Sequence, residues 1–211
     1  MPKTAALLNV SIPLQQQEGV DEQFYSSDGP VLYVFFGLIA TGKSTLARAW
    51  AQRRGLAHYN SDVVRKELAG LAVTAKSRDE EGRGIYTPEF TLRTYDELRR
   101  RAANELRQGR SVVLDASYHD RDQRQRLVEL AVSLEVGLHF VLCQCSDEVK
   151  KQRLARRAQD PAAVSDGRWE IYLRQRQKYQ PPTEQPASRL TTIDTDRPVP
   201  KLLAELSRRL P

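Results

Sequence analysis

The sequence predicts a single α/β domain built around a parallel, doubly wound sheet, and three features indicate this fold. Val31–Phe36 is β-branched, aromatic and apolar on both faces, as a central parallel strand requires. Four further apolar runs suit buried strands, at residues 57–60, 111–115, 138–143 and 190–194. Segments with helical spacing lie between these runs, such as residues 44–54, 92–108 and 123–135. Alternating strands and helices are typical of a parallel sheet with helices on both faces.

Length and composition agree with one globular domain. The 211 residues allow one well-buried core. Residues 1–29 lack strand or helix periodicity, so we expect a loose N-terminal extension followed by a domain over residues 30–211. The longest apolar stretch, Val31–Ala40, is shorter than the roughly 20 residues that span a bilayer. No secretory signal pattern opens the chain, and we therefore expect a cytoplasmic protein that does not contact membranes.

The cysteines and the net charge narrow the functional classes. Cys143 and Cys145 lie two residues apart on one predicted strand, where a disulfide has poor geometry, so we expect reduced thiols. The three histidines have no metal-ligand spacing with these cysteines, which argues against structural zinc. The net charge of +6 suits an anionic ligand, either a nucleotide or a nucleic acid.

A phosphate-binding motif follows the first predicted strand and opens a predicted helix. It consists of Gly37, Leu38, Ile39, Ala40, Thr41, Gly42, Lys43 and Ser44, which match G-x-x-x-x-G-K-[ST]. The glycines let backbone N–H groups turn towards phosphate oxygens, and the helix N-terminus adds positive charge. Lys43 is expected to reach the β- and γ-phosphates and Ser44 to coordinate Mg²⁺, with Thr45 beside them. The motif predicts ATP and Mg²⁺ as the ligands.

Two acids directly after predicted strands are candidates for chemistry, because parallel sheets bind ligands at the carboxyl ends of their strands. Asp62 follows residues 57–60, and Arg65 shares its helix face, so the pair suits a general base and an acceptor contact. A structural role for Asp62, in a first turn capped by Ser61, is the alternative. Asp115 ends its strand where a carboxylate assists Mg²⁺. Either acid suits the role of general base.

Arginines in the second half of the chain are candidates for binding the transferred phosphate. Arg153 and Arg157 are four residues apart on a predicted helix that leads into a break ending at Gly167, which we interpret as a lid. Arg156 competes for the same role, and a solvated basic helix is the alternative. Arg121 and Arg124, shortly after Asp115, are weaker candidates for the acceptor site.

These elements together resemble the AAA_33 and zeta-toxin-like P-loop kinases, over about residues 31–211. The resemblance depends on the phosphate-binding motif and on residues 61–66, 114–117 and 153–157. It implies a P-loop NTPase fold of three α/β/α layers, with a five-stranded parallel sheet of order 2-3-1-4-5 and an arginine-bearing lid. It also implies roles for five residues and one loop: Asp62 as general base, Arg65 at the acceptor, Asp115 at Mg²⁺, Arg153 and Arg157 in the lid, and residues 195–198 beside the adenine.

The sequence therefore predicts an ATP-dependent kinase that phosphorylates a hydroxyl of a small molecule. Because the wider group includes polynucleotide kinases and gluconate kinases, the 5′-hydroxyl of a nucleic acid is the alternative acceptor. Few aromatic residues accompany the basic ones, which disfavours a base-stacking platform. A regulatory module that binds ATP without transfer is a third reading, disfavoured because such a module has no need for a base at Asp62.

Overall fold

The computed structural model describes residues 29–75, 84–159 and 169–211. The predicted N-terminal extension and the centre of the predicted lid lie outside the described residues. Among the described residues, none of the helices is long and apolar enough to cross a membrane.

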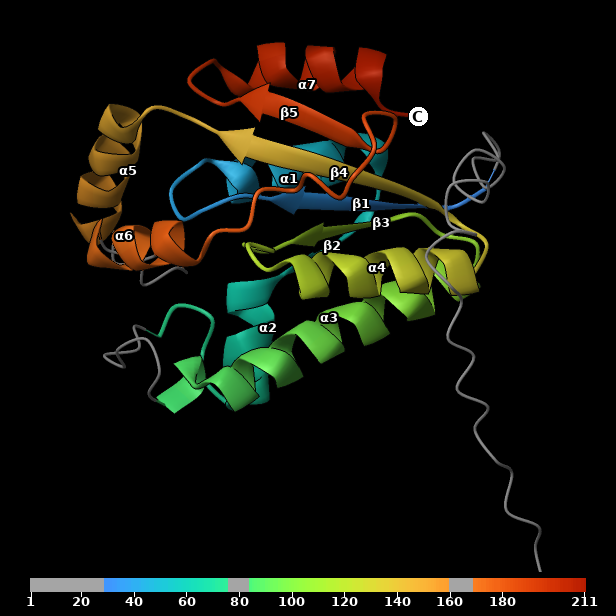
Figure 1. The fold of residues 1–211 in the computed structure, drawn as a ribbon, viewed down its shortest axis with the longest axis horizontal. Helices are drawn as coiled ribbons and strands as arrows, with labels where there is room; N and C mark the ends of the chain where they lie inside the picture. The colour runs from blue at the N-terminus through green and yellow to red at the C-terminus, as the bar shows by residue number, and fades with distance from the viewer. Residues whose placement is uncertain (1–28, 76–83, 160–168) are drawn as a thin grey trace, which may run out of the picture.

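The core of the fold is a five-stranded parallel sheet of order β2-β3-β1-β4-β5 (Figure 1), as the sequence predicts. Its strands are β1 (Val31–Phe36), β2 (Ala57–Asn60), β3 (Val112–Asp115), β4 (Gly137–Gln144) and β5 (Leu190–Asp194). Asn60 is in register with Asp115, and Asp115 with Phe35, so the last residues of β2 and β3 and the penultimate residue of β1 meet at one edge. This shared carboxyl edge is where the sheet presents its functional side chains.

Helices cover both faces of the sheet. They are α1 (Lys43–Arg54), α2 (Ser61–Leu68), α3 (Pro88–Arg107), α4 (Arg121–Ser133), α5 (Asp147–Gln159), α6 (Trp169–Lys178) and α7 (Val199–Arg209), with a 3-10 turn at Gly84–Tyr86. One apolar core joins α2, α3 and α4 to Leu32, Val34 and Phe36 of β1. A second core joins α1 and α7 to the alternate residues Tyr33 and Phe35. The side-chain alternation of a strand thus divides β1 between two apolar layers.

Helices α5 and α6 lie beyond the carboxyl ends of the strands, at the edge towards which the arrowheads point in Figure 1. Leu154 of α5 and Tyr172 of α6 pack against Ile39 and Ala40 in the loop between β1 and α1. The two helices therefore border the phosphate-binding motif directly.

Two predicted helices begin earlier in the structure than in the sequence analysis. Helix α3 begins at Pro88, because the Thr87 side chain accepts a hydrogen bond from Phe90 N and proline is tolerated in the first turn. Helix α4 begins at Arg121, because the Asp120 side chain accepts hydrogen bonds from the N–H groups of Asp122 and Gln123. Both caps precede the apolar periodicity on which the prediction rested.

Candidate active site

The phosphate-binding loop, residues 37–44, adopts a tight conformation that requires glycine at two positions. Gly37 has φ +139°, and a Cβ atom there would lie 2.4 Å from the Cys143 carbonyl oxygen of β4. Gly42 has φ +82°, and a Cβ atom there would lie 3.0 Å from an Arg153 guanidinium nitrogen. Gly42 also precedes the first residue of α1 with no side-chain cap, so the helix N-terminus faces the loop uncovered. This geometry suits backbone N–H groups that bind phosphate.

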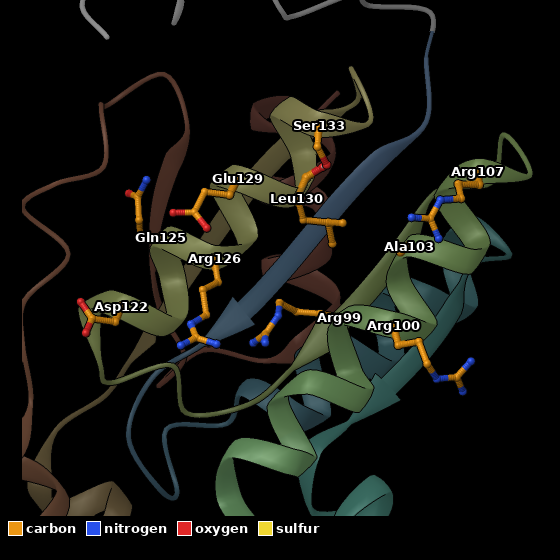
Figure 2. A pocket seen from close by; sticks show the side chains of 10 residues that line it. All are labelled: Arg99, Arg100, Ala103, Arg107, Asp122, Gln125, Arg126, Glu129, Leu130 and Ser133. Carbon is orange, nitrogen blue, oxygen red and sulfur yellow. The ribbon is translucent and has the colours of Figure 1, made fainter. Parts of the chain in front are cut away.

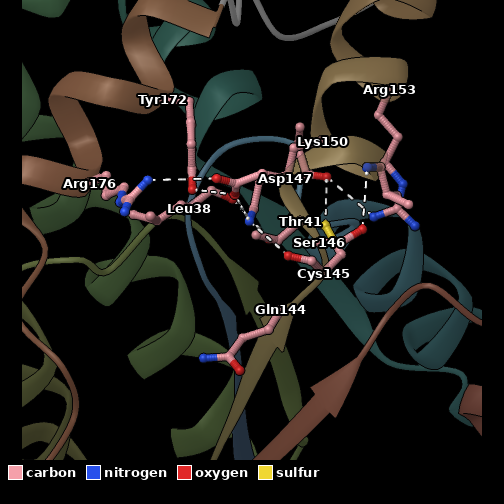
Figure 3. Close-up of polar contacts among 12 residues, drawn as sticks. Leu38, Thr41, Gln144, Cys145, Ser146, Asp147, Lys150, Arg153, Tyr172 and Arg176 are labelled. Carbon is pink, nitrogen blue, oxygen red and sulfur yellow. Dashed lines mark hydrogen bonds and ion pairs between the residues drawn. The ribbon is translucent and has the colours of Figure 1, made fainter.

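Arg153 connects this loop to the segment after β5 (Figure 3). Its guanidinium donates to Ala40 O at 3.3 Å, Thr195 Oγ1 at 3.1 Å and Thr195 O at 2.6 Å. Thr195 Oγ1 in turn lies 2.6 Å from Thr41 O and 3.0 Å from Gln144 O. The sequence analysis assigned Arg153 to the transferred phosphate, and the structure adds a role in fixing the shape of the loop. The sequence analysis placed residues 195–198 beside the adenine but did not predict this contact of Thr195 with the phosphate-binding loop.

A cavity of about 420 Å³ opens beside the loop and suits a nucleobase. Helices α1, α5 and α7 and the segment after β5 line it with Gly42, Thr45, Leu46, Arg153, Arg156, Arg157, Thr195, Arg197, Val199 and Leu202. Within the described residues, Arg156 and Arg157 form no hydrogen bond or ion pair with a protein group. The structure thus brings the predicted lid arginines next to Gly42 and Thr45, on the side of the loop where α1 begins.

Asp115 is the buried acid of the site. Asn60 Nδ2 lies 2.5 Å from Asp115 Oδ2 and 3.4 Å from Ser44 Oγ, so one amide links the two predicted metal ligands. Burial alone would raise the pKa of the Asp115 carboxyl, but His58, Lys43 and Asn60 outweigh it and the pKa is lowered. His58 Nε2 approaches to 3.6 Å of Oδ2.

The second oxygen of this carboxylate fits a metal site. Asp115 is fully buried, and its Oδ1 has no hydrogen-bond partner among the described residues. An ionised carboxylate with one oxygen unpaired, close to a serine hydroxyl and a lysine, is a donor set suited to Mg²⁺ and its waters. Asn60 was not identified from the sequence, although it precedes the predicted Ser61–Asp62 pair.

Asp62 lies in the first turn of α2, and the capping residue is Asn60, not Ser61 as in the structural alternative for Asp62. Asn60 Oδ1 accepts from Asp62 N at 3.0 Å and from Val63 N at 3.1 Å. Within the described part of the chain, no hydrogen bond or ion pair engages the Asp62 carboxylate itself. Because Asn60 already satisfies the helix N-terminus, the carboxylate remains available to a ligand.

Arg65 has a structural partner set that the sequence did not indicate. Its guanidinium donates to Ile85 O at 2.6 Å and to Thr91 Oγ1 at 3.2 Å, and it lies over the ring of Tyr86. The side chain is 6% exposed, and its Nε is buried without a hydrogen-bond partner. Arg65 therefore joins α2 to α3 through Nη1, and within the described residues its Nη2 has no hydrogen-bond partner and remains for an acceptor.

A chain of polar groups not identified from the sequence follows β3. The Ser117 hydroxyl lies 2.9 Å from Tyr95 Oη and 3.0 Å from His119 Nδ1. Burial raises the pKa of the Tyr95 phenol, and the nearby Asp62 charge raises it further. Because the Asp62 charge acts on Tyr95, these hydroxyl and imidazole groups form a polar chain that begins near Asp62.

Arg124 does not face an acceptor, which corrects the sequence analysis. It is fully buried and donates to Glu184 Oε1 at 2.6 Å, Glu184 Oε2 at 3.1 Å and Tyr118 O at 2.8 Å. The pair joins α4 to the segment after α6. Arg121 contacts the segment after α6 through its backbone, because its N–H donates to Gln180 Oε1 at 2.6 Å.

A second, shallower groove lies between α3 and α4 and is rich in arginine (Figure 2). Arg99, Arg100, Arg107 and Arg126 line it, together with Asp122 and Glu129. Arg99 and Arg126 both approach Asp96, and Arg100 donates twice to Glu97. Because carboxylates offset these guanidiniums, the groove is a poor candidate for a polyanion site.

The sheet order, the phosphate-binding loop and the buried acid after β3 together form a P-loop fold of the kinase type. The AAA_33 family, described as an AAA domain, matches residues 32–182, and the chain belongs to this family. An uncharacterized protein of Mycobacterium tuberculosis, Rv2004c, is 30% identical over 118 residues, which cover 56% of this chain and 24% of that protein. The chain thus spans about a quarter of the length of this curated relative.

Solved kinase structures share the fold. A candidate kinase from Chloroflexus aurantiacus has a TM-score of 0.64 at 20% identity, covering 87% of this chain and 100% of that one. The APS kinase CysC of Mycobacterium tuberculosis, in complex with AMPPNP and APS, has a TM-score of 0.58 at 17% identity, covering 86% and 97%. At these identities the likeness establishes the architecture.

Proposed function

We propose that this protein is an ATP-dependent kinase of the cytoplasm that transfers the γ-phosphoryl group of Mg-ATP to a hydroxyl of a small molecule. The observation that carries the proposal is that two carboxylates lie at the carboxyl ends of the neighbouring strands β2 and β3, and Asn60 contacts both residues. Asp115 is buried, ionised and has an unpaired Oδ1, and Asp62 has no partner among the described residues. A nucleotide-binding module that performs no transfer has no use for the second carboxylate.

In this proposal each residue has one role. The amides of the loop and Lys43 bind the phosphates, and Lys43 offsets the charge that develops on the γ-phosphoryl group. Ser44 and Asp115 would hold Mg²⁺, which neutralises phosphate charge when bound. Asp62 accepts the proton of the acceptor hydroxyl as that oxygen attacks phosphorus.

The remaining site residues position the substrates. Arg153 fixes the loop, Arg157 borders the nucleotide, and Arg65 contacts the acceptor through Nη2. The AMPPNP and APS bound to the related APS kinase support ATP and a small acceptor as substrates. The charge-compensated groove between α3 and α4 gives no support to a nucleic-acid acceptor.

The test replaces Asp62 by asparagine and uses Asp122→Asn as the matched control. Both acids occupy the second position after a capping side chain, Asn60 in α2 and Asp120 in α4. If Asp62 is the base, Asp62→Asn should lower turnover by about 100-fold or more while AMPPNP affinity stays within about twofold. Asp122→Asn should leave both unchanged.

A structural Asp62 gives the opposite pattern. The two variants would then each lose only about 0.3–1 kcal/mol of stability and keep near-normal turnover, and the role of base would pass to Asp115. The assay follows label from ATP to a panel of hydroxyl-bearing metabolites and 5′-hydroxyl oligonucleotides. Transfer to oligonucleotides alone, weakening steeply with salt, would replace the small-molecule acceptor by a nucleic acid.

A further inference from the structure

A side chain of α6 holds one backbone donor of the phosphate-binding loop. Ile39, the third residue of the loop, donates its N–H to Gln175 Oε1 at 3.0 Å. Helix α6, which carries Gln175, is held against α5: the Asp147 carboxylate of α5 accepts from Tyr172 Oη of α6 at 2.6 Å and from Lys150 Nζ of α5 at 2.8 Å (Figure 3). Gln175 is therefore placed at the loop by the packing of α6 against α5.

The contacts of the loop indicate which phosphate lies near Gln175. Gly42 and Thr45 line the cavity suited to the base, so the chain of phosphates begins at that end. At the other end, Gly37 N donates to Ser117 O at 3.2 Å, which places the start of the loop beside the polar groups after β3. Ile39 lies towards this second end, where the terminal phosphate and an acceptor would meet.

The segment after α6 continues across the same region. Gln180 N donates to His119 O at 3.0 Å, and Gln180 Oε1 accepts from Arg121 N. The stretch from Gln175 to Gln180 thus contacts the loop after β1 and the loop after β3, which are neighbouring strands. A terminal phosphate bound between these two loops would therefore lie next to the Gln175 side chain.

The carboxamide of Gln175 has a donor to spare. The amide oxygen of Gln175, and not its nitrogen, must face Ile39, because the backbone N–H of Ile39 is a donor. Within the described residues, Nε2 has no partner, and the side chain is half-buried. A fixed N–H donor next to an anionic oxygen forms a charge-assisted hydrogen bond.

We propose that Gln175 binds the γ-phosphoryl group of the nucleotide through Nε2 while Oε1 holds the Ile39 amide. The proposal deepens the proposed function and rests on its nucleotide site. Gln175 is then the residue by which the α6 helix distinguishes a nucleoside triphosphate from a diphosphate.

The test compares AMPPNP and ADP binding, in Mg²⁺ buffer, by calorimetry on Gln175→Glu. A glutamate still accepts from Ile39 N, but it cannot donate and it repels the γ-phosphate. AMPPNP affinity should fall by about tenfold to a hundredfold, while ADP affinity stays within about twofold. Gln177→Glu, an exposed neighbour on the same helix, is the matched charge control and should leave both affinities unchanged.

Two outcomes would overturn the proposal. Equal losses for ADP and AMPPNP in Gln175→Glu would mean that the residue only supports the loop, and no loss for either would mean that it has no nucleotide role. Neither outcome affects the assignment of kinase activity, which depends on transfer by the unmodified protein. Conversely, an unmodified protein that binds both nucleotides without transferring phosphate would refute the kinase proposal and leave the Gln175 comparison valid.

Discussion

Replacing Arg153 by lysine separates a structural role from a purely catalytic one. The guanidinium makes three hydrogen bonds that join the phosphate-binding loop to Thr195. Lysine keeps the charge but lacks the planar fork, so we expect it to retain one of these bonds. At about 1.5 kcal/mol for each charged bond, the low end of the range because Arg153 is half-exposed, the loss is about 3 kcal/mol.

The assay is thermal unfolding of the nucleotide-free protein. For a chain of this size, about 3 kcal/mol lowers the melting temperature by roughly 6–12 °C. Arg156 lies three residues along the same helix and forms no hydrogen bond or ion pair among the described residues, so Arg156→Lys is the control and should melt like the unmodified protein. A melting temperature of Arg153→Lys within about 2 °C of the unmodified protein would refute the structural role and leave Arg153 with a catalytic one only.

Three further predictions concern stability and the loop. Burial lowers the pKa of His139 from 6.5 to about 4. Between these two pH values the unfolded chain binds a proton that the folded chain does not, so the free energy of unfolding should fall by on the order of 3 kcal/mol as the pH drops from 6.5 to about 4. Denaturant titrations of His139→Asn should show a flatter dependence on pH. Gly37→Ala forces a Cβ atom to within 2.4 Å of Cys143 O, so ADP affinity by calorimetry should fall at least about tenfold, and retained affinity would contradict the geometry of the loop. Glu184→Gln leaves the buried Arg124 charge without its carboxylate, so the melting temperature should fall by at least about 5 °C. A smaller fall would show that the ion pair contributes little to stability.

Strands β1, β3 and β4 were predictable from the sequence because each is a mostly buried and mostly apolar run. Val31–Phe36 and Leu190–Asp194 match the observed β1 and β5 in full. Helix starts were less predictable, since Thr87 and Asp120 act as caps before any apolar periodicity begins. A capping side chain is polar and short, so the sequence does not distinguish it from a loop residue.

The residues of the candidate site also fall into those that the sequence predicts and those that it does not. The motif residues Lys43 and Ser44 were visible because their chemistry requires adjacent positions in the chain. Asn60 was not, because its link to Asp115 depends on the pairing of β2 with β3 across 55 residues. Thr195 and Gln175 contact the loop from more than 130 residues away. A single sequence gives no signal for such contacts.

Arginines were the least predictable residues. Arg65 and Arg124 share with Arg157 an identical side chain and a helical setting, yet the first two are buried among protein carbonyls and carboxylates. Arg157 instead lines the cavity beside Gly42. Which arginine remains available to a ligand depends on the partners that tertiary packing supplies, and these lie far away in the sequence.

The measurement that tests the central claim most directly is transfer of labelled γ-phosphate from Mg-ATP to a panel of hydroxyl-bearing metabolites, run in parallel on the unmodified protein and Lys43→Ala. The account predicts one phosphorylated product with the unmodified protein and a loss of at least about 100-fold with Lys43→Ala, because no other residue of the motif offsets the β- and γ-phosphate charge. Product formed equally well by Lys43→Ala, or formed after complete chelation of Mg²⁺, would contradict it.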